Sequence, residues 1–146
     1  MKVFVEPYLN FDGNTKEAFR FYQKVFRTPD PYFMTFSEAA QEDGMDDPEW
    51  QAFPSDATMH ASMKVGDYSI MGSDSMPGEY EPTAGFLLSF AADDVDEVKR
   101  VWDEFIAAGS EVQMELEKTF WSQLYGILKD PYGVPWMITH YDQDEA

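Results

Sequence analysis

Two titratable side chains stand where acid–base chemistry could be built. Glu6 lies inside the largely apolar run of residues 3–8, and His60 lies in the strand-like run of residues 57–65. A carboxylate in such a run costs on the order of several kcal/mol unless it faces a wet or partnered cavity, or the solvent side of an edge strand. Glu6 and His60 could therefore act as general base and general acid, or as two ligands of a weakly held metal ion.

Aromatic side chains accompany these groups at strand-like spacing. If Glu6 faces inward, period-two alternation turns Tyr8 to the same face. The same alternation along residues 121–128 places Trp121, Gln123 and Tyr125 on one face. One interpretation is an aromatic pocket that holds a carboxylate and an imidazole. The other is that the aromatic rings pack in the core and that His60 is an ordinary strand histidine.

Other kinds of chemistry lack their sequence signatures. The chain has no cysteine, which excludes disulfides, thiolate metal sites and a cysteine nucleophile. It contains no GxGxxG, no GxxxxGK[ST], no HExxH and no GxSxG, so neither nucleotide binding nor a serine nucleophile is indicated. The second histidine, His140, is followed by an acidic tail and is expected at the surface.

The charge balance narrows the choice of partners. The chain has 146 residues, with 28 acidic and 10 basic side chains and a formal net charge of −18. That charge repels phosphate backbones and anionic lipid, so we expect neither nucleic acid nor a membrane as partner. No apolar run approaches the roughly 20 residues of a membrane helix, and the N-terminus lacks the pattern of a signal peptide. We therefore expect a cytoplasmic protein whose acidity serves solubility or attracts a cationic ligand.

The chain begins with the pattern of a strand and a helix. Residues 3–11 alternate in hydrophobicity, which predicts a strand. Asn14 and Glu17 have the spacing of a capping box and predict the start of a helix. Its apolar side chains recur at helical spacing as far as Phe26.

Three further elements complete the first half. A short strand is expected over residues 32–37, followed by a solvated loop over residues 38–49. Residues 57–65 and 68–73 flank Gly66-Asp67, which predicts a hairpin between two strands. The first half therefore has the element order βαβββ.

The second half repeats this order about 80 residues later. Residues 84–91 predict a strand, and Asp94 with Glu97 predicts the start of a helix that ends at Gly109. Strand-like runs follow at residues 112–116, 121–128 and 136–141.

The duplication predicts an α+β fold of two tandem βαβββ modules. We expect the first module over residues 1–74, a linker over residues 75–83 and the second module over residues 84–146. One helix cannot hide both faces of a four-stranded sheet, so paired modules are expected to curl around a shared interior. The expected result is a curved, partly open β-barrel or cup, with the helices outside and the two modules forming one compact domain.

Several motifs, in this order, resemble the PhnB-like branch of the glyoxalase/bleomycin resistance/dioxygenase (vicinal oxygen chelate) superfamily. The resemblance spans nearly the whole chain and rests on residues 7–14, 17–22, 59–61, 120–126 and 130–136. It implies the duplicated βαβββ fold, and it implies a homodimer because family members commonly pair. Some relatives carry the label of a demethylubiquinone methyltransferase, but this sequence has no glycine-rich S-adenosylmethionine loop.

The resemblance also implies positions for a chelated divalent ion. Metal-using members place ligands on the first and last strand of each module, and strand alignment puts Glu6, Met71, Gly85 and Met137 at those places. Only Glu6 is a hard ligand, so we expect no catalytic metal and no cofactor, with a weakly bound divalent metal as the alternative.

Three functions are compatible with these patterns. The first is binding of a small planar or cationic organic ligand in the cup without turnover, by the following residues: Glu6, Tyr8, His60, Trp121, Gln123, Tyr125 and Met137. The second is a metal-dependent or acid–base enzyme of the lyase, isomerase or dioxygenase type, with Glu6 and His60 as the catalytic candidates. The third is a non-catalytic dimeric interaction protein.

Overall fold

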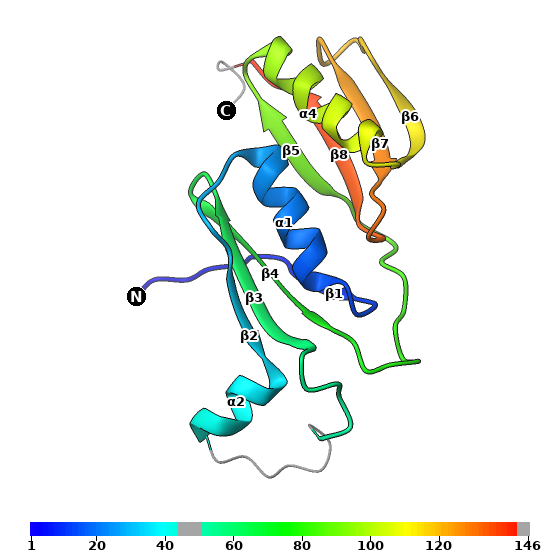
Figure 1. Ribbon diagram of the computed structural model, residues 1–146. Coiled ribbons are helices and arrows are strands. Elements are labelled where there is room, and N and C mark those ends of the chain that lie inside the picture. The colour runs from blue at the N-terminus through cyan, green and yellow to red at the C-terminus, as the bar shows by residue number, and fades with distance from the viewer. Residues whose placement is uncertain (44–50, 143–146) are drawn as a thin grey trace. The chain divides into compact units, whose positions relative to one another are not determined.

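The computed structural model describes residues 1–43 and 51–142 of the chain (Figure 1). The chain divides into two compact units, Met1–Glu81 and Pro82–Ala146. The strands are β1 (Tyr8–Phe11), β2 (Tyr32–Thr35), β3 (Thr58–Val65), β4 (Tyr68–Asp74), β5 (Leu88–Ala92), β6 (Glu111–Glu117), β7 (Tyr125–Lys129) and β8 (Pro135–His140). The helices are α1 (Thr15–Phe26), α2 (Phe36–Asp43) and α4 (Val95–Ala107).

Both units have the same strand order. The first sheet runs β1-β4-β3-β2 and the second runs β5-β8-β7-β6. The first and last strands of each unit pair in parallel, with Tyr8 opposite Met71 and Leu88 opposite Trp136. The other neighbouring strands are antiparallel. The α+β class and the duplicated βαβββ order are therefore confirmed. Each sheet is open at both edges. A shared interior between the two modules stays a prediction.

In the first unit, α1 packs on one face of the sheet because its apolar side chains recur at helical spacing. Phe19 lies edge-on to Phe11 of β1 at 6.1 Å and to Phe33 of β2 at 6.2 Å between ring centroids. The apolar side chains of this unit that are least exposed are Leu9, Phe11, Ala18, Phe19, Tyr22, Val25, Ala39 and Ala61.

Gly72 of β4 permits the close packing of this layer. A Cβ atom at this position would lie 2.9 Å from the carbonyl oxygen of Leu9, and 3.1 and 3.2 Å from the rings of Phe11 and Phe19. Because two of these neighbours are buried rings and the third is backbone, the position accepts only glycine without displacing the core.

The start of α1 differs from the predicted capping box. Asn14 occupies the N-cap position, but its side chain makes no capping hydrogen bond, and its Oδ1 atom is buried without a partner among the described residues. Asp74, at the end of β4, supplies the cap instead. Its Oδ1 accepts hydrogen bonds from the Thr15 amide at 3.0 Å and the Thr15 hydroxyl at 2.7 Å, and its Oδ2 accepts from the Thr58 amide at 2.8 Å.

In the second unit, α4 begins as the sequence predicts. The Asp94 side chain accepts a hydrogen bond from the Glu97 amide at 3.0 Å, and Gly109 adopts a positive φ of 97° just beyond the helix. Phe105 of α4 contacts Trp136 of β8, with 5.4 Å between ring centroids. The hydrophobic face of α4 therefore covers one face of the second sheet.

Several predicted boundaries are wrong. The first strand begins at Tyr8 rather than at residue 3, because Pro7 has no N–H to donate to a ladder. The segment predicted as a loop after β2 starts with the helix α2, while residues 44–49 of that predicted loop lie outside the described part. The strand predicted from residue 84 begins only at Leu88, and the strand predicted from residue 121 begins only at Tyr125.

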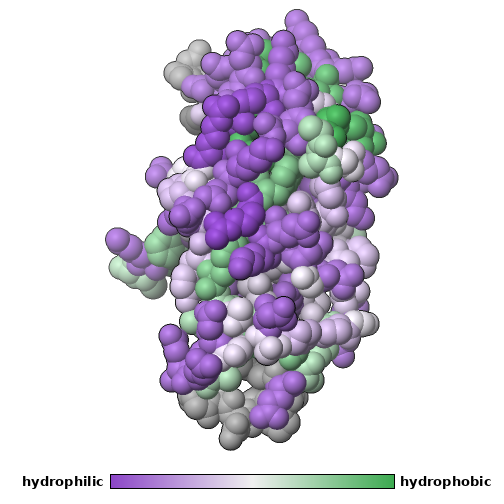
Figure 2. Space-filling view, viewed as in Figure 1, coloured by the Kyte–Doolittle hydropathy of each residue, from purple (hydrophilic) through white to green (hydrophobic). Residues whose placement is uncertain are grey.

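The surface is dominated by hydrophilic side chains. Figure 2 shows mostly hydrophilic residues on the visible face, with smaller hydrophobic patches between them. Among the described residues, no helix is both long enough and apolar enough to span a membrane.

Candidate functional site

Each sheet has one face directed away from its main helix, which we call its distal face. In the first sheet, Leu9 and Phe11 are buried with α1, so alternation turns Tyr8 to the distal face. In the second sheet, a Cβ atom on Gly126 would meet the ring of Trp102 in α4 at 2.7 Å, so Tyr125 faces away from α4. The predicted site residues that lie on strands are all on these distal faces: Tyr8, His60, Tyr125 and Met137.

The distal face of the first sheet brings Tyr8 and His60 together. The Tyr8 hydroxyl and His60 Nδ1 share a hydrogen bond of 3.0 Å, and the two rings stack with 5.7 Å between centroids. The ring of Tyr32 from β2 lies 6.5 Å from His60 on the same face. Tyr8 and Tyr32 remain 47% and 52% exposed, so their rings are available to a ligand within this unit. Sequence reasoning missed Tyr32 because its place beside His60 follows from the pairing of Met34 with His60, which no local sequence pattern contains.

Glu6 lies just before β1 rather than within a strand. The Pro7 carbonyl accepts a hydrogen bond from the Met71 amide at 3.1 Å, so pairing with β4 begins immediately after Glu6. The Oε2 atom of Glu6 is buried, and no described group hydrogen-bonds to it. Within residues 1–43 and 51–142, no hydrogen bond or ion pair joins Glu6 to His60, so the structure shows no contact for this predicted acid–base pair.

In the second unit, Trp121 and Tyr125 come together as predicted, but not through strand alternation. Their rings meet edge-on with 5.4 Å between centroids, and Phe120 meets Trp121 at 4.6 Å. Trp121 and Gln123 lie in the loop before β7, so the prediction that both share a strand face with Tyr125 is wrong. Trp121 is 52% exposed and Phe120 is 96% exposed. Phe120 is thus an aromatic neighbour that the sequence analysis left out of the site.

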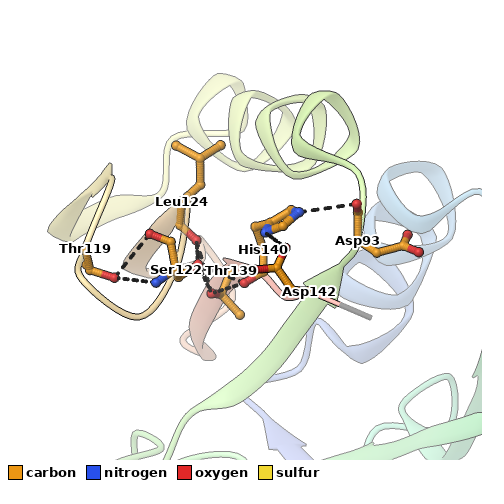
Figure 3. A network of polar contacts seen from close by, with 7 residues as sticks. All are labelled: Asp93, Thr119, Ser122, Leu124, Thr139, His140 and Asp142. Carbon is orange, nitrogen blue, oxygen red and sulfur yellow. Dashed lines mark hydrogen bonds and ion pairs between the residues drawn. The ribbon is translucent and has the colours of Figure 1, made fainter. Parts of the chain in front are cut away.

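A network of polar contacts fixes the loop that carries Trp121 (Figure 3). The Ser122 amide donates to the Thr119 hydroxyl at 3.1 Å, which closes a tight turn around Trp121. The Ser122 hydroxyl lies 2.7 Å from the Leu124 carbonyl oxygen and 2.8 Å from the His140 carbonyl oxygen. This turn explains why the strand predicted from residue 121 starts later, and it holds the indole beside Tyr125.

His140 is buried rather than exposed, which corrects the expectation for this residue. Only 6% of it is accessible, its Nε2 atom lies 3.2 Å from the Asp93 carbonyl oxygen, and its Nδ1 atom lies 3.9 Å from the Asp142 carboxylate (Figure 3). The acidic tail therefore begins next to a core histidine. The imidazole links the end of β8 to the start of α4.

The donor set does not fit a tightly held divalent ion. Of the positions that the superfamily resemblance assigns to a chelate, Met71 and Met137 carry thioethers, Gly85 carries no side chain, and only Glu6 offers oxygen ligands. Within either unit, the described His, Asp and Glu side chains form no group of three that could hold a metal ion. The residues at these positions therefore do not supply the donor set that such a chelate requires.

Two duplicated βαβββ modules of this topology define the vicinal oxygen chelate fold. Comparison with solved structures agrees: the fosfomycin resistance protein FosX from Listeria monocytogenes is 10% identical, with a TM-score of 0.65 over 99% of this chain and 98% of that one. At that identity the likeness concerns the fold alone.

Sequence comparison identifies the family, within this fold, to which the chain belongs. A family model described as 3-demethylubiquinone-9 3-methyltransferase matches residues 4–139, and the chain belongs to this PhnB-like family of the vicinal oxygen chelate superfamily. Protein YjdN of Escherichia coli (strain K12) is 35% identical over 137 residues, which cover 92% of each chain.

Two solved structures extend the comparison. Protein PA1353 from Pseudomonas aeruginosa is 32% identical, with a TM-score of 0.80 over 97% of this chain and 100% of that chain. A putative 3-demethylubiquinone-9 3-methyltransferase, PhnB protein, from Bacillus cereus is 20% identical, with a TM-score of 0.73 over 94% and 98%.

Proposed function

We propose that this protein binds small planar or cationic organic molecules by stacking on aromatic rings at the distal face within a unit, without a chelated metal and without turnover. The observation that carries the proposal is the half-exposed state of three aromatic rings held in fixed contacts: Tyr8, Tyr32 and Trp121. Burial of a large aromatic side chain is strongly favourable in free energy. Aromatic rings that are ordered but still half-exposed to solvent therefore favour a ligand that stacks on them.

The charge of the chain supports a cationic ligand. A net charge of −18 raises the local concentration of cations around the protein. On the first unit, Glu6 has a carboxylate oxygen without a hydrogen-bond partner among the described residues, close in sequence to the Tyr8 ring. A planar cation would gain from the aromatic faces and from the carboxylate together.

Methyl transfer is not part of the proposal, although the family description names it. The nine glycines of the chain stand singly, and no glycine-rich loop is present that would cradle a nucleoside-bearing methyl donor. The family membership therefore supports the fold, while the activity named in the description has no corresponding motif in this sequence.

Titration with proflavine, a planar aromatic cation, tests the proposal. We expect proflavine to quench tryptophan fluorescence and raise the melting temperature, and Trp121→Ala to weaken its binding about tenfold, since stacking with a cation contributes roughly 1–2 kcal/mol. Tyr8→Ala and Glu6→Gln test the first unit in the same way. Isothermal titration calorimetry gives the dissociation constants.

The matched control is Tyr68→Ala. Tyr68 is 76% exposed, like the site aromatics, but its place two residues before the core residue Ile70 puts it on the opposite face of the first sheet from Tyr8. Its loss should leave proflavine affinity unchanged. Absence of any proflavine binding, or equal losses in Tyr68→Ala and Trp121→Ala, would contradict the proposal.

We also propose that two copies associate, because the apolar residues 3–5 are largely exposed. Val3, Phe4 and Val5 are 74%, 72% and 95% exposed. Light scattering at micromolar concentration should give twice the 16.8 kDa mass of one chain. Phe4→Ser should lower the measured molar mass toward that of a single chain. A molar mass of one chain for the unmodified protein would overturn this proposal.

A further inference from the structure

A cavity of about 490 Å³ lies at one end of the second sheet, where β5 approaches the turn between β7 and β8. Its volume is in the range of small-molecule sites, roughly 300–1,000 Å³. All of its described walls belong to the second unit, and none of them is acidic: Thr83, Ala84, Gly85, Phe86, Leu87, Gln113, Lys129 and Pro135. None of these residues belongs to the aromatic set that the proposed function uses.

Among the walls of this cavity that the structure describes, Lys129 is the one charged side chain. It is half-buried at the end of β7, and no described residue forms an ion pair or side-chain hydrogen bond with it. Glu111 lies opposite it on β6, yet their charged atoms are not within ion-pair distance. In a chain with 28 acidic and 10 basic side chains, a half-buried lysine without an acidic partner among the described residues leaves a positive charge that an external anion could neutralise.

The other walls determine what kind of anion fits. Phe86 and Leu87 are 48% and 39% exposed and present apolar surface beside the ammonium group, and Pro135 is buried at the start of β8. Gln113 adds an amide that can donate a hydrogen bond. One lysine ammonium group beside apolar walls suits a ligand that carries one negative charge on an apolar body. The protein's net charge of −18 repels anions and therefore disfavours a ligand with several negative charges.

We infer that this cavity binds a small organic monoanion, a carboxylate on an aromatic or aliphatic body, with the carboxylate on Lys129 and the body against Phe86 and Leu87. The site lies on the distal face of the second sheet, because Lys129 follows Tyr125 by four residues on β7. It is distinct in its residues and in its charge preference from the site for a planar cation.

Benzoate is the probe, with benzamide as its neutral isostere. Chemical shift perturbation of backbone amides in the full chain should map benzoate to the amides of Leu87, Gln113 and Lys129. Benzamide should bind at least about tenfold more weakly, because a charge-assisted hydrogen bond contributes roughly 1.5–3 kcal/mol. Lys129→Met, which keeps the length of the side chain, should weaken benzoate at least about tenfold and leave benzamide unaffected.

Three variants serve as controls. Lys99→Met removes an exposed lysine of α4 and should leave benzoate affinity unchanged. Glu111→Gln removes a carboxylate on the neighbouring strand that would repel an anion, and it should strengthen benzoate binding. Trp121→Ala should weaken proflavine and spare benzoate, so failure of one site is distinguishable from failure of the other. Equal affinity for benzoate and benzamide, undetectable benzoate binding, or full affinity in a folded Lys129→Met protein would overturn the inference.

Discussion

An Asp130→Ala variant is expected to lose about 3 kcal/mol from the unfolding free energy of the second unit. Asp130 is 4% exposed and accepts three hydrogen bonds of 2.9 Å, from the amides of Tyr132 and Val134 and from the indole N–H of Trp136. Removing the carboxylate leaves three donors without their acceptor, two of them buried. Hydrogen bonds to charged groups contribute roughly 1.5–3 kcal/mol each, and partial access of water to the turn limits the sum.

Urea unfolding followed by tryptophan fluorescence measures this loss. Trp102 and Trp136 are buried in the second unit, so a Trp50→Phe, Trp121→Phe background lets their emission report on it. Asp130→Asn should lie between alanine and the parent protein, because its amide keeps one acceptor. Asp103→Ala, at an exposed position of α4, should change stability by less than about 0.5 kcal/mol. If Asp130→Ala lowered the unfolding free energy by less than about 0.5 kcal/mol, this account of the turn would be refuted.

The elements that sequence analysis predicted well are those set by local patterns. Hydrophobic spacing located α1 and α4, and Gly66-Asp67 located the hairpin between β3 and β4, because helix faces and two-residue turns are encoded within a few residues. The cap of α1 was predicted wrongly for the opposite reason. Its acceptor, Asp74, is 59 residues away from Thr15, and no local pattern contains that contact.

The candidate site was predictable only where its residues lie on regular strands, which local patterns encode. Alternation correctly placed Tyr8 and His60 on one face, since both lie on regular strands. It failed for Gln123 because the turn between Thr119 and Ser122 interrupts the extended backbone, and hydroxyl groups make such turns without a strong sequence signal. Trp121 still meets Tyr125 because the turn, rather than a strand, positions it.

An Asp74→Ala variant is expected to destabilise the first unit by about 3 kcal/mol and to do so locally. Asp74 joins the first turn of α1 to the start of β3, because one oxygen accepts two hydrogen bonds from Thr15 and the other accepts one from the Thr58 amide. The carboxylate is 7% exposed, and its charge also complements the positive end of the helix dipole. Its loss therefore removes a helix cap and a strand contact together.

Hydrogen exchange separates this local effect from a general loss of stability. Amides of α1 and β3 should lose protection in Asp74→Ala, while those of α4 and β8 should exchange as in the parent protein, because the two units have separate cores. Thr15→Val, which removes only the hydroxyl, should cost about 1 kcal/mol, and Asp56→Ala, at an exposed position before β3, should cost almost nothing. Equal loss of protection in both units would show that Asp74 acts through something other than these three bonds.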